Sequence, residues 1–222
     1  MDGNRRWARE NGYQALVKGH QAGMEAADRV INFCLKSNIK ILTLYAFSIE
    51  NFNRSDSEKE YLFDLIADAS DKNINKYTQK GISVRFVGDR TLFPESTIEN
   101  IKKIEQKTAD QTKLQLNILF CYGAQQELVS ATRLIAQKVK EGLLEIDDIN
   151  EANLRDSLWL TGRSDPDLIL RTGGTARLSN FLLYQAAYSE LQFLDCYWPE
   201  VTEQHLTECI NKFNMTKRNF GH

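Results

Sequence analysis

The strongest constraint on the fold is a nearly continuous apolar run at 39–47, with the sequence IKILTLYAF. A strand this apolar is typical of a parallel sheet, in which helices cover both faces. A second run, LQLNILF, lies at 114–120, and segments with helical spacing flank both runs. This alternation predicts an α/β fold with a mostly parallel central sheet and helices on both faces.

The same patterns give approximate limits for each element. Ser57 and Glu60 have the spacing of a capping box at the start of a long helix, and Gly81 ends that helix. The expected helices are 19–37, 57–80, 94–109, 124–141, 152–158 and 202–215, and the expected strands are 39–47, 82–86, 114–120, 167–170 and 190–193. Because 222 residues with only 3 prolines leave little room for a linker, we expect residues 1–222 to form a single domain.

Composition argues against several classes of function. The formal net charge is −2, so no overall positive field attracts nucleic acid, and we expect no nucleic-acid partner. The 4 cysteines are widely spaced and form no C-x-x-C pair, which favours free thiols in a reducing compartment over a zinc site. The chain shows neither a secretory leader nor an apolar run of the roughly 18 residues that a membrane span needs. We therefore expect a cytoplasmic protein.

Polar segments follow several of the expected strands. They are SIENFNR at 48–54, CYGA at 121–124 and RTGGTARLSN at 171–180. In a doubly wound sheet these segments meet at the carboxyl edge, where the ligands of such folds bind. Arginines gathered at one edge repel one another unless an anion lies between them, so this edge predicts a polyanionic ligand. The residues alone leave open the alternative of surface loops that carry arginines by chance.

The N-terminal segment MDGNRRW at 1–7 suits the same ligand. Asp2 can coordinate a hard cation such as Mg²⁺ through oxygen. Arg6, with Arg5 beside it, can bind two phosphate oxygens at once, and Gly3 allows the backbone to approach a ligand closely. The combination indicates a diphosphate with its metal ion, and the alternative is a solvated turn. The chain lacks the P-loop, the dinucleotide-binding fingerprint and the G-x-S-x-G nucleophile elbow.

Several segments occur in the order and at the spacing of the cis-prenyltransferases, and most closely of the bacterial undecaprenyl diphosphate synthases. The chain resembles this family over essentially its whole length. The segments are MDGNRRWA at 1–8, GH at 19–20, LTLYAFSIENFNRS at 42–55, FVGD at 86–89, LILRTGGTARLSNFLLYQAAYSEL at 168–191 and KRNFG at 217–221. The resemblance implies an enzyme that adds isopentenyl diphosphate repeatedly to an allylic diphosphate, usually farnesyl diphosphate, with Mg²⁺ as cofactor.

The resemblance carries further expectations about product and partners. The product is expected to be undecaprenyl diphosphate, which serves as the lipid carrier for envelope glycans. The family forms homodimers, and release of a lipid product implies peripheral contact with the inner face of the membrane. A short-chain cis-prenyl diphosphate synthase is the first alternative, because it would share every site residue. A non-catalytic subunit of a prenyltransferase complex is a weaker alternative, since such subunits lack residues that this chain keeps as Asp2, Arg6 and Arg54.

The resemblance also assigns roles to single residues. Asp2 is expected to be the carboxylate that binds Mg²⁺ and the main catalytic residue, and Asn51 is expected to assist catalysis. Glu190 is expected to be a second metal carboxylate that reaches across the dimer interface. The expected cradle of the allylic diphosphate is the backbone from Gly3 to Arg5 with the Arg6 and Arg54 side chains. The other expected substrate-binding residues are Asn4, Trp7, His20, Ser48, Glu50 and Phe52. The expected isopentenyl diphosphate residues are Arg171, Arg177 and Ser179.

Some positions depart from the family pattern. Relatives have a short apolar strand ahead of the motif at 1–8, and this sequence begins at the motif, so either the sequence starts after that strand or the strand is missing. Leu16 replaces a common arginine, for which Lys18 is a candidate substitute. Trp7 and Phe47 resemble aromatic residues that flank the growing prenyl chain. The expected lining of the hydrocarbon tunnel, with ordinary core as the alternative for each residue, is Ala46, Leu62, Leu65, Ile66, Ala69 and the strand at 114–120.

Overall fold

The computed structural model of the protein describes residues 1–13, 17–161 and 165–216. Leu16 and the motif at 217–221 lie outside these ranges. The helices are α1 (Asn4–Glu10), α2 (Val17–Lys36), α3 (Asp56–Lys72), α4 (Ile74–Lys80), α5 (Glu95–Thr108), α6 (Ala124–Lys140), α7 (Glu151–Ser157) and α8 (Glu203–Met215). Short 3₁₀ segments are η1 (Ile49–Asn53), η2 (Arg90–Leu92), η3 (Ile146–Asp148) and η4 (Trp198–Glu200).

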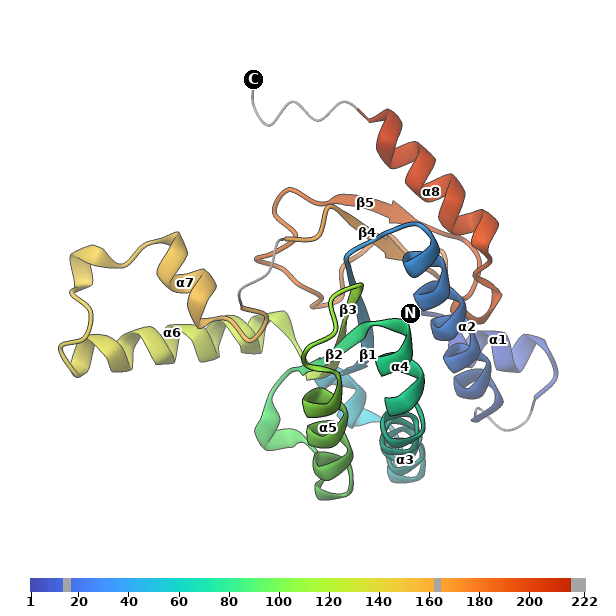
Figure 1. The fold of residues 1–222 in the computed structure, drawn as a ribbon, viewed down its shortest axis with the longest axis horizontal. Coiled ribbons are helices and arrows are strands. Elements are labelled where there is room, and N and C mark those ends of the chain that lie inside the picture. The colour runs from blue at the N-terminus through green and yellow to red at the C-terminus, as the bar shows by residue number, and fades with distance from the viewer. Residues whose placement is uncertain (14–16, 162–164, 217–222) are drawn as a thin grey trace.

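All paired strands run parallel, as the sequence predicts, but they form two sheets and not one. The strands are β1 (Ile41–Ser48), β2 (Ile82–Val87), β3 (Leu114–Tyr122), β4 (Leu168–Arg171) and β5 (Glu190–Phe193). One sheet has the order β1-β3-β2, and the other contains β4 and β5. Within the described residues, β1 and β4 are therefore edge strands, and Figure 1 shows the two sheets lying near each other at the centre of the molecule.

Helices cover both faces of the larger sheet. Leu116 and Phe120 of β3 belong to the larger hydrophobic cluster, together with residues of α2, α3 and α5. Leu119 belongs to a second cluster with Ala124 of α6 and Leu182. Successive side chains of a strand point to opposite faces, so the two clusters lie on opposite sides of β3. Figure 1 shows α6 and α7 extending together away from the sheets.

The helix expected at 57–80 is two helices, α3 and α4, with the break at Asn73. The Asn73 side-chain amide donates a hydrogen bond to the carbonyl oxygen of Ala69 at 2.8 Å. Such a bond from a side chain to the preceding turn competes with the helical ladder. The start of α3 also differs from expectation, because Ser55 and not Ser57 precedes its first turn. Gly81 ends α4 with φ of 74°, as expected.

Residues of the N-terminal motif form the helix α1, whereas the sequence predicts only a binding site or a turn there. Gly3 precedes this helix with φ of 103°, a backbone conformation that L side chains rarely adopt. A Cβ at this position would lie 2.5 Å from a ring carbon of Tyr197. Gly3 is therefore required both by its backbone angle and by the close contact between α1 and the segment before η4.

Candidate active site

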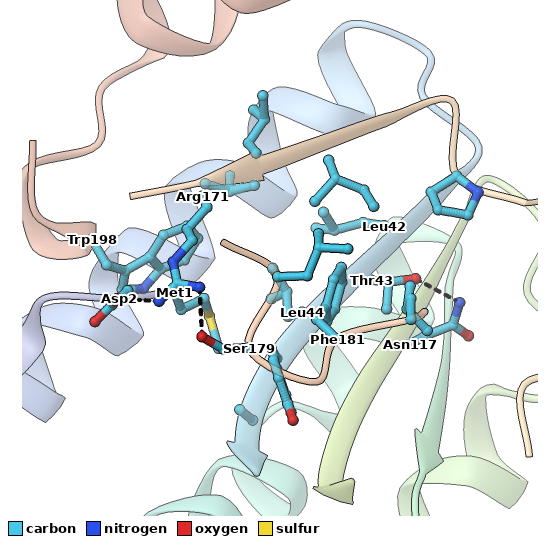
Figure 2. Close-up of a pocket in the computed structure, with 18 of the residues that line it drawn as sticks. Met1, Asp2, Leu42, Thr43, Leu44, Asn117, Arg171, Ser179, Phe181 and Trp198 are labelled. Atoms are coloured by element: carbon cyan, nitrogen blue, oxygen red, sulfur yellow. Dashed lines mark hydrogen bonds and ion pairs between the residues drawn. The ribbon is translucent and has the colours of Figure 1, made fainter. Parts of the chain in front are cut away.

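A cavity of about 1010 Å³ opens where β1 and β4 end. Figure 2 shows Asp2, Arg171 and Ser179 together at one end of it, with Leu42, Leu44 and Phe181 farther along. Most of the residues that the sequence predicted for the site line this one cavity. They are Asp2, Gly3, Asn4, Arg5, Arg6, His20, Ser48, Asn51, Arg54, Arg171, Arg177 and Ser179.

Asp2 is held in place through its backbone. Its N–H donates to the Thr172 hydroxyl at 2.9 Å, and that hydroxyl donates to the Asp2 carbonyl oxygen at 2.7 Å. The carboxylate accepts a hydrogen bond from Arg171 at 2.8 Å and lies 3.4 Å from the Arg6 guanidinium. Partial burial raises the pKa of Asp2, but the hydrogen bond and charge of Arg171 and the charge of Arg6 outweigh burial, so its pKa is lowered overall. Asp2 is therefore an ionised carboxylate at the mouth of the cavity.

Arg171 connects the N-terminal motif to the segment after β4. Its Nη1 donates to the Ser179 hydroxyl at 2.8 Å and to the carbonyl oxygen of Arg177. Its Nε is buried and has no hydrogen-bond partner among the described residues. The Arg177 side chain is exposed at the cavity mouth. Because both guanidinium groups line the cavity, they can bind an anion that enters it from outside the protein.

A second cluster of basic side chains surrounds the carboxylate of Glu58. This carboxylate accepts from Arg54 at 3.0 Å, contacts His20 Nε2 at 3.2 Å and lies 3.9 Å from Arg5 Nε. Burial lowers the pKa of His20, and the nearby Arg54 and Arg5 lower it further against the opposing effect of Glu58. Glu58 is not among the site residues predicted from the sequence. Its position four residues after Arg54, on the first turns of α3, is the signal that could have identified it.

Close backbone approach is needed at Gly173 as well. Its φ is 88°, and a Cβ there would lie 2.4 Å from Arg6 Nη2. Arg6 donates from Nη1 to the Gly173 carbonyl oxygen at 2.9 Å, and its guanidinium lies over the Tyr197 ring, 5.1 Å from the centroid. Tyr197, which the sequence analysis did not identify, thus supports a guanidinium that faces the cavity.

The segment after β1 places two more predicted residues on the cavity wall. The Ser48 N–H donates to the Asn51 side-chain oxygen at 3.1 Å, which closes a tight turn at the start of η1. Both residues line the cavity, whereas Glu50 does not. Glu50 instead accepts a hydrogen bond from the Asn180 amide at 2.8 Å.

The structure does not bring every predicted residue to the cavity. Trp7, Glu50, Phe52 and Glu190 are absent from the lining, so their roles stay predictions. Trp7 stacks on Tyr13 with 5.7 Å between ring centroids. Phe52 packs edge-on against Phe47, which is 0% exposed within an aromatic cluster. Phe47 is therefore a core residue, and the expectation that it flanks a bound prenyl chain is corrected.

The inner part of the cavity is apolar and lies between strand edges. Consecutive residues 39–46 and 165–171 line it, as expected where a cavity faces the edge of a strand and not one of its faces. Val30, Phe33 and Cys34 of α2 form another wall. Of the residues expected to line a tunnel, Ala46, Leu62 and Asn117 do so, whereas Leu65, Ile66, Ala69 and the other residues of the strand at 114–120 do not.

The Asp2 carboxylate has few neighbouring side chains that could bind the same metal ion. The described residues contain no group of three or more His, Cys, Asp or Glu side chains placed to hold one ion. This donor set suits Mg²⁺, which commonly binds to one or two carboxylates and takes its other ligands from phosphate oxygens and water. In addition, none of the described helices is both long and apolar enough to cross a membrane.

Comparison with known proteins gives consistent matches. A family model described as "Putative undecaprenyl diphosphate synthase" matches residues 1–221. The chain is 38% identical over 221 residues to an isoprenyl transferase of Bacillus subtilis (strain 168), with coverage of 100% of this chain and 85% of that protein. It is 39% identical to a ditrans,polycis-undecaprenyl-diphosphate synthase ((2E,6E)-farnesyl-diphosphate specific) of Xylella fastidiosa (strain 9a5c), with coverage of 100% and 86%.

Solved structures agree with these matches. Lavandulyl diphosphate synthase from Lavandula x intermedia, in complex with dimethylallyl diphosphate, superposes with a TM-score of 0.96 at 31% identity, covering 100% of this chain and 95% of that chain. A probable undecaprenyl diphosphate synthase from Campylobacter jejuni superposes with a TM-score of 0.80 at 33% identity, covering 91% and 93%. The chain therefore belongs to the undecaprenyl diphosphate synthase family of prenyltransferases.

Proposed function

We propose that this protein catalyses cis-prenyl chain elongation, in which isopentenyl diphosphate is added repeatedly to farnesyl diphosphate to give undecaprenyl diphosphate. The observation that carries the proposal is the set of arginine donors at the cavity mouth. Arg5, Arg6, Arg54, Arg171 and Arg177 all line this cavity, and its inner part is apolar. Such a site suits ligands with a diphosphate head and a hydrocarbon tail.

The charges of the site support the chemistry of this reaction. The allylic carbon–oxygen bond breaks, and its electron pair leaves with the diphosphate. The double bond of isopentenyl diphosphate forms the new carbon–carbon bond, and a proton is then lost from the resulting cation. Fixed guanidinium groups stabilise the leaving diphosphate more as its charge grows, which lowers the barrier. Ser48 and Asn51, which line the cavity, are placed to orient the substrates.

Asp2 is the residue that we propose for binding Mg²⁺. The bound ion would supply positive charge at the departing diphosphate. Glu190 is the second carboxylate that we propose, acting across a homodimer interface. Its Oε1 is buried and lacks a hydrogen-bond partner among the described residues, and it lies outside the lining of the cavity that contains Asp2. An acceptor in this state needs a partner, which a metal ion or a neighbouring subunit would supply.

The edges of β1 and β4 limit where the hydrocarbon tail of a bound substrate could lie. Backbone groups on the edges of β1 and β4 need hydrogen-bond partners, and a hydrocarbon supplies none. We therefore propose that the hydrocarbon tail does not occupy the space between these edges. The growing prenyl chain would then lie on the α2 side of the cavity, against Val30, Phe33 and Leu62.

A homodimer with peripheral membrane contact completes the proposed function. Exposed apolar side chains cluster around β5, where Tyr188 is 75% exposed, Leu191 43% and Phe193 38%. An apolar cluster of this kind suits a subunit interface. The enzyme would act in the cytoplasm and contact the inner face of the membrane during release of its lipid product.

A short-chain cis-prenyl diphosphate synthase is the second candidate function. The close superposition on lavandulyl diphosphate synthase favours it, because the overall fold is shared with an enzyme whose structure contains dimethylallyl diphosphate. The two functions differ in product length and not in the residues at the cavity mouth.

Product analysis tests the proposed function directly. We expect incubation with farnesyl diphosphate, radiolabelled isopentenyl diphosphate, Mg²⁺ and detergent to give a ladder of polyprenyl products that ends at the undecaprenyl length. A single short product would replace the long-chain function with the short-chain one. Absence of any product, from protein that remains folded by circular dichroism, would contradict both.

Replacement of Arg177 by alanine tests the isopentenyl diphosphate site. Because its exposed guanidinium faces the cavity mouth, we expect Arg177→Ala to raise the KM for isopentenyl diphosphate about 10- to 100-fold, the loss of one or two charge-assisted hydrogen bonds. Steady-state kinetics with each substrate varied in turn measure this. Arg133→Ala, an exposed arginine of α6 outside the cavity, is the matched control. A fall in kcat with unchanged KM would argue against this role for Arg177.

A further inference from the structure

The loop at 177–182, which follows β4 and carries Arg177 and Ser179, has an unusual backbone. Ser179, Asn180 and Leu182 all have positive φ, with values of 50°, 63° and 41°. Non-glycine residues rarely adopt this conformation, and asparagine tolerates it better than most. A loop of this shape needs contacts that hold it in place. Most of those contacts are made by Asn180.

Asn180 bonds to two other elements of the fold, η1 and the start of α6. Its side-chain amide donates to Glu50 Oε1 at 2.8 Å and to Gln126 Oε1 at 3.0 Å. Its side-chain oxygen accepts from the Gln125 N–H at 2.8 Å, and its backbone carbonyl accepts from the Ala124 N–H at 2.9 Å. One residue thus joins the loop to the start of α6 and to the segment after β1.

The bond to Glu50 has a particular consequence for the site. Glu50 lies between Ser48 and Asn51, the two residues of the 48–51 segment that line the cavity. Asn180 directly follows Ser179, which accepts from Arg171. A single amide–carboxylate bond therefore spans 130 positions of sequence and joins the segments proposed for the two substrates. Burial alone raises the pKa of Glu50, but hydrogen bonds, first that from Asn180, lower it overall, so the acceptor is charged.

We propose that Asn180 is a positioning residue that, through Glu50, holds the 48–51 segment and the 177–182 loop in fixed relation around the diphosphate site. The inference rests on the proposed function, because it assigns these two segments to the two substrates. Asn180 contacts neither substrate; it fixes the groups that do. The competing explanation is that Asn180 is present only because its backbone adopts positive φ.

Glycine at position 180 separates these two explanations. Asn180→Gly keeps access to positive φ and removes only the amide. We expect this variant to raise the KM for isopentenyl diphosphate about tenfold, with a smaller change in kcat. Gln126→Ala, which removes the other side-chain acceptor but leaves the Glu50 bond, is the matched control and should change KM less than about twofold. An unchanged KM for isopentenyl diphosphate in Asn180→Gly would overturn the proposal.

A double-mutant cycle tests the link itself. If Asn180 acts through Glu50, then Glu50→Ala should reproduce the effect of Asn180→Gly, and the double variant should be no worse than either single variant. Glu50→Gln, which keeps an acceptor oxygen, should restore most of the lost affinity. Independent, additive losses in the double variant would mean that the two residues act separately, and the proposal would fail.

Hydrogen–deuterium exchange gives a readout that does not depend on turnover. In Asn180→Gly, the amides at 48–54 should exchange faster, although they lie far away in sequence, and in Glu50→Ala those at 177–182 should do so. Glu50 is exposed, so its variant tests the link even where Asn180→Gly fails to fold. If both variants show the expected faster exchange but the protein makes no prenyl product, only the proposed function is contradicted. Normal turnover with unchanged exchange would contradict this inference alone.

Discussion

Asp2→Ala is expected to lower kcat by two or more orders of magnitude, with little loss of folded protein. Asp2 provides the ionised carboxylate at the cavity mouth, between Arg171 and Arg6. Removal of one preorganised electrostatic group from an active site typically costs about 100- to 1000-fold in kcat. The loss here should reach at least this range, because the variant removes the proposed Mg²⁺ ligand and also leaves Arg171 without its carboxylate partner.

Asp2→Asn is the matched control for this prediction, because it keeps the side-chain shape and an acceptor for Arg171 but removes the charge. Single-turnover measurements with farnesyl diphosphate and labelled isopentenyl diphosphate, over a range of Mg²⁺ concentrations, separate chemistry from product release. Asp2→Asn should be nearly as slow as Asp2→Ala if the charge binds the ion. Wild-type rates in either variant would remove Asp2 from the mechanism.

Much of the fold could be predicted because it depends on local patterns. The apolar run that became β3 and the glycine that ends α4 both act through neighbouring residues. The break at Asn73 was missed because a single side-chain bond to Ala69 decides it within a sequence of otherwise helical character. The division into two sheets was missed because the order of strands depends on pairing between segments far apart in sequence.

The candidate site was predictable to a similar extent. Residues that follow strands in a parallel fold gather at one edge, so Ser48 and Arg171 could be placed together from the sequence. Residues that act only through others could not. Glu58 contacts Arg54, Arg5 and His20, and Asn180 joins segments 130 positions apart, yet neither belongs to a motif with an evident ligand. Such roles depend on tertiary contacts, which a linear motif does not contain.

Arg171→Lys is expected to lower kcat/KM for isopentenyl diphosphate about 100-fold or more while keeping the net charge. Arg171 uses Nη2 for Asp2 and Nη1 for Ser179 and the Arg177 carbonyl, and it lines the cavity. Lysine has one ammonium group and cannot reproduce a planar fork with separate donors. The variant should therefore lose both the diphosphate contact and the arrangement of the 177–182 loop.

The comparison that decides this prediction is with Arg177→Lys, since both variants exchange the same groups at the same cavity mouth. Arg177 is exposed and its side chain has fewer fixed contacts, so a flexible ammonium should replace it with a loss of roughly tenfold or less. Kinetics for both substrates, together with titration of inorganic pyrophosphate, measure the two effects side by side. Equal losses in the two variants would show that charge alone matters at position 171, and that the fixed geometry of its guanidinium contributes nothing.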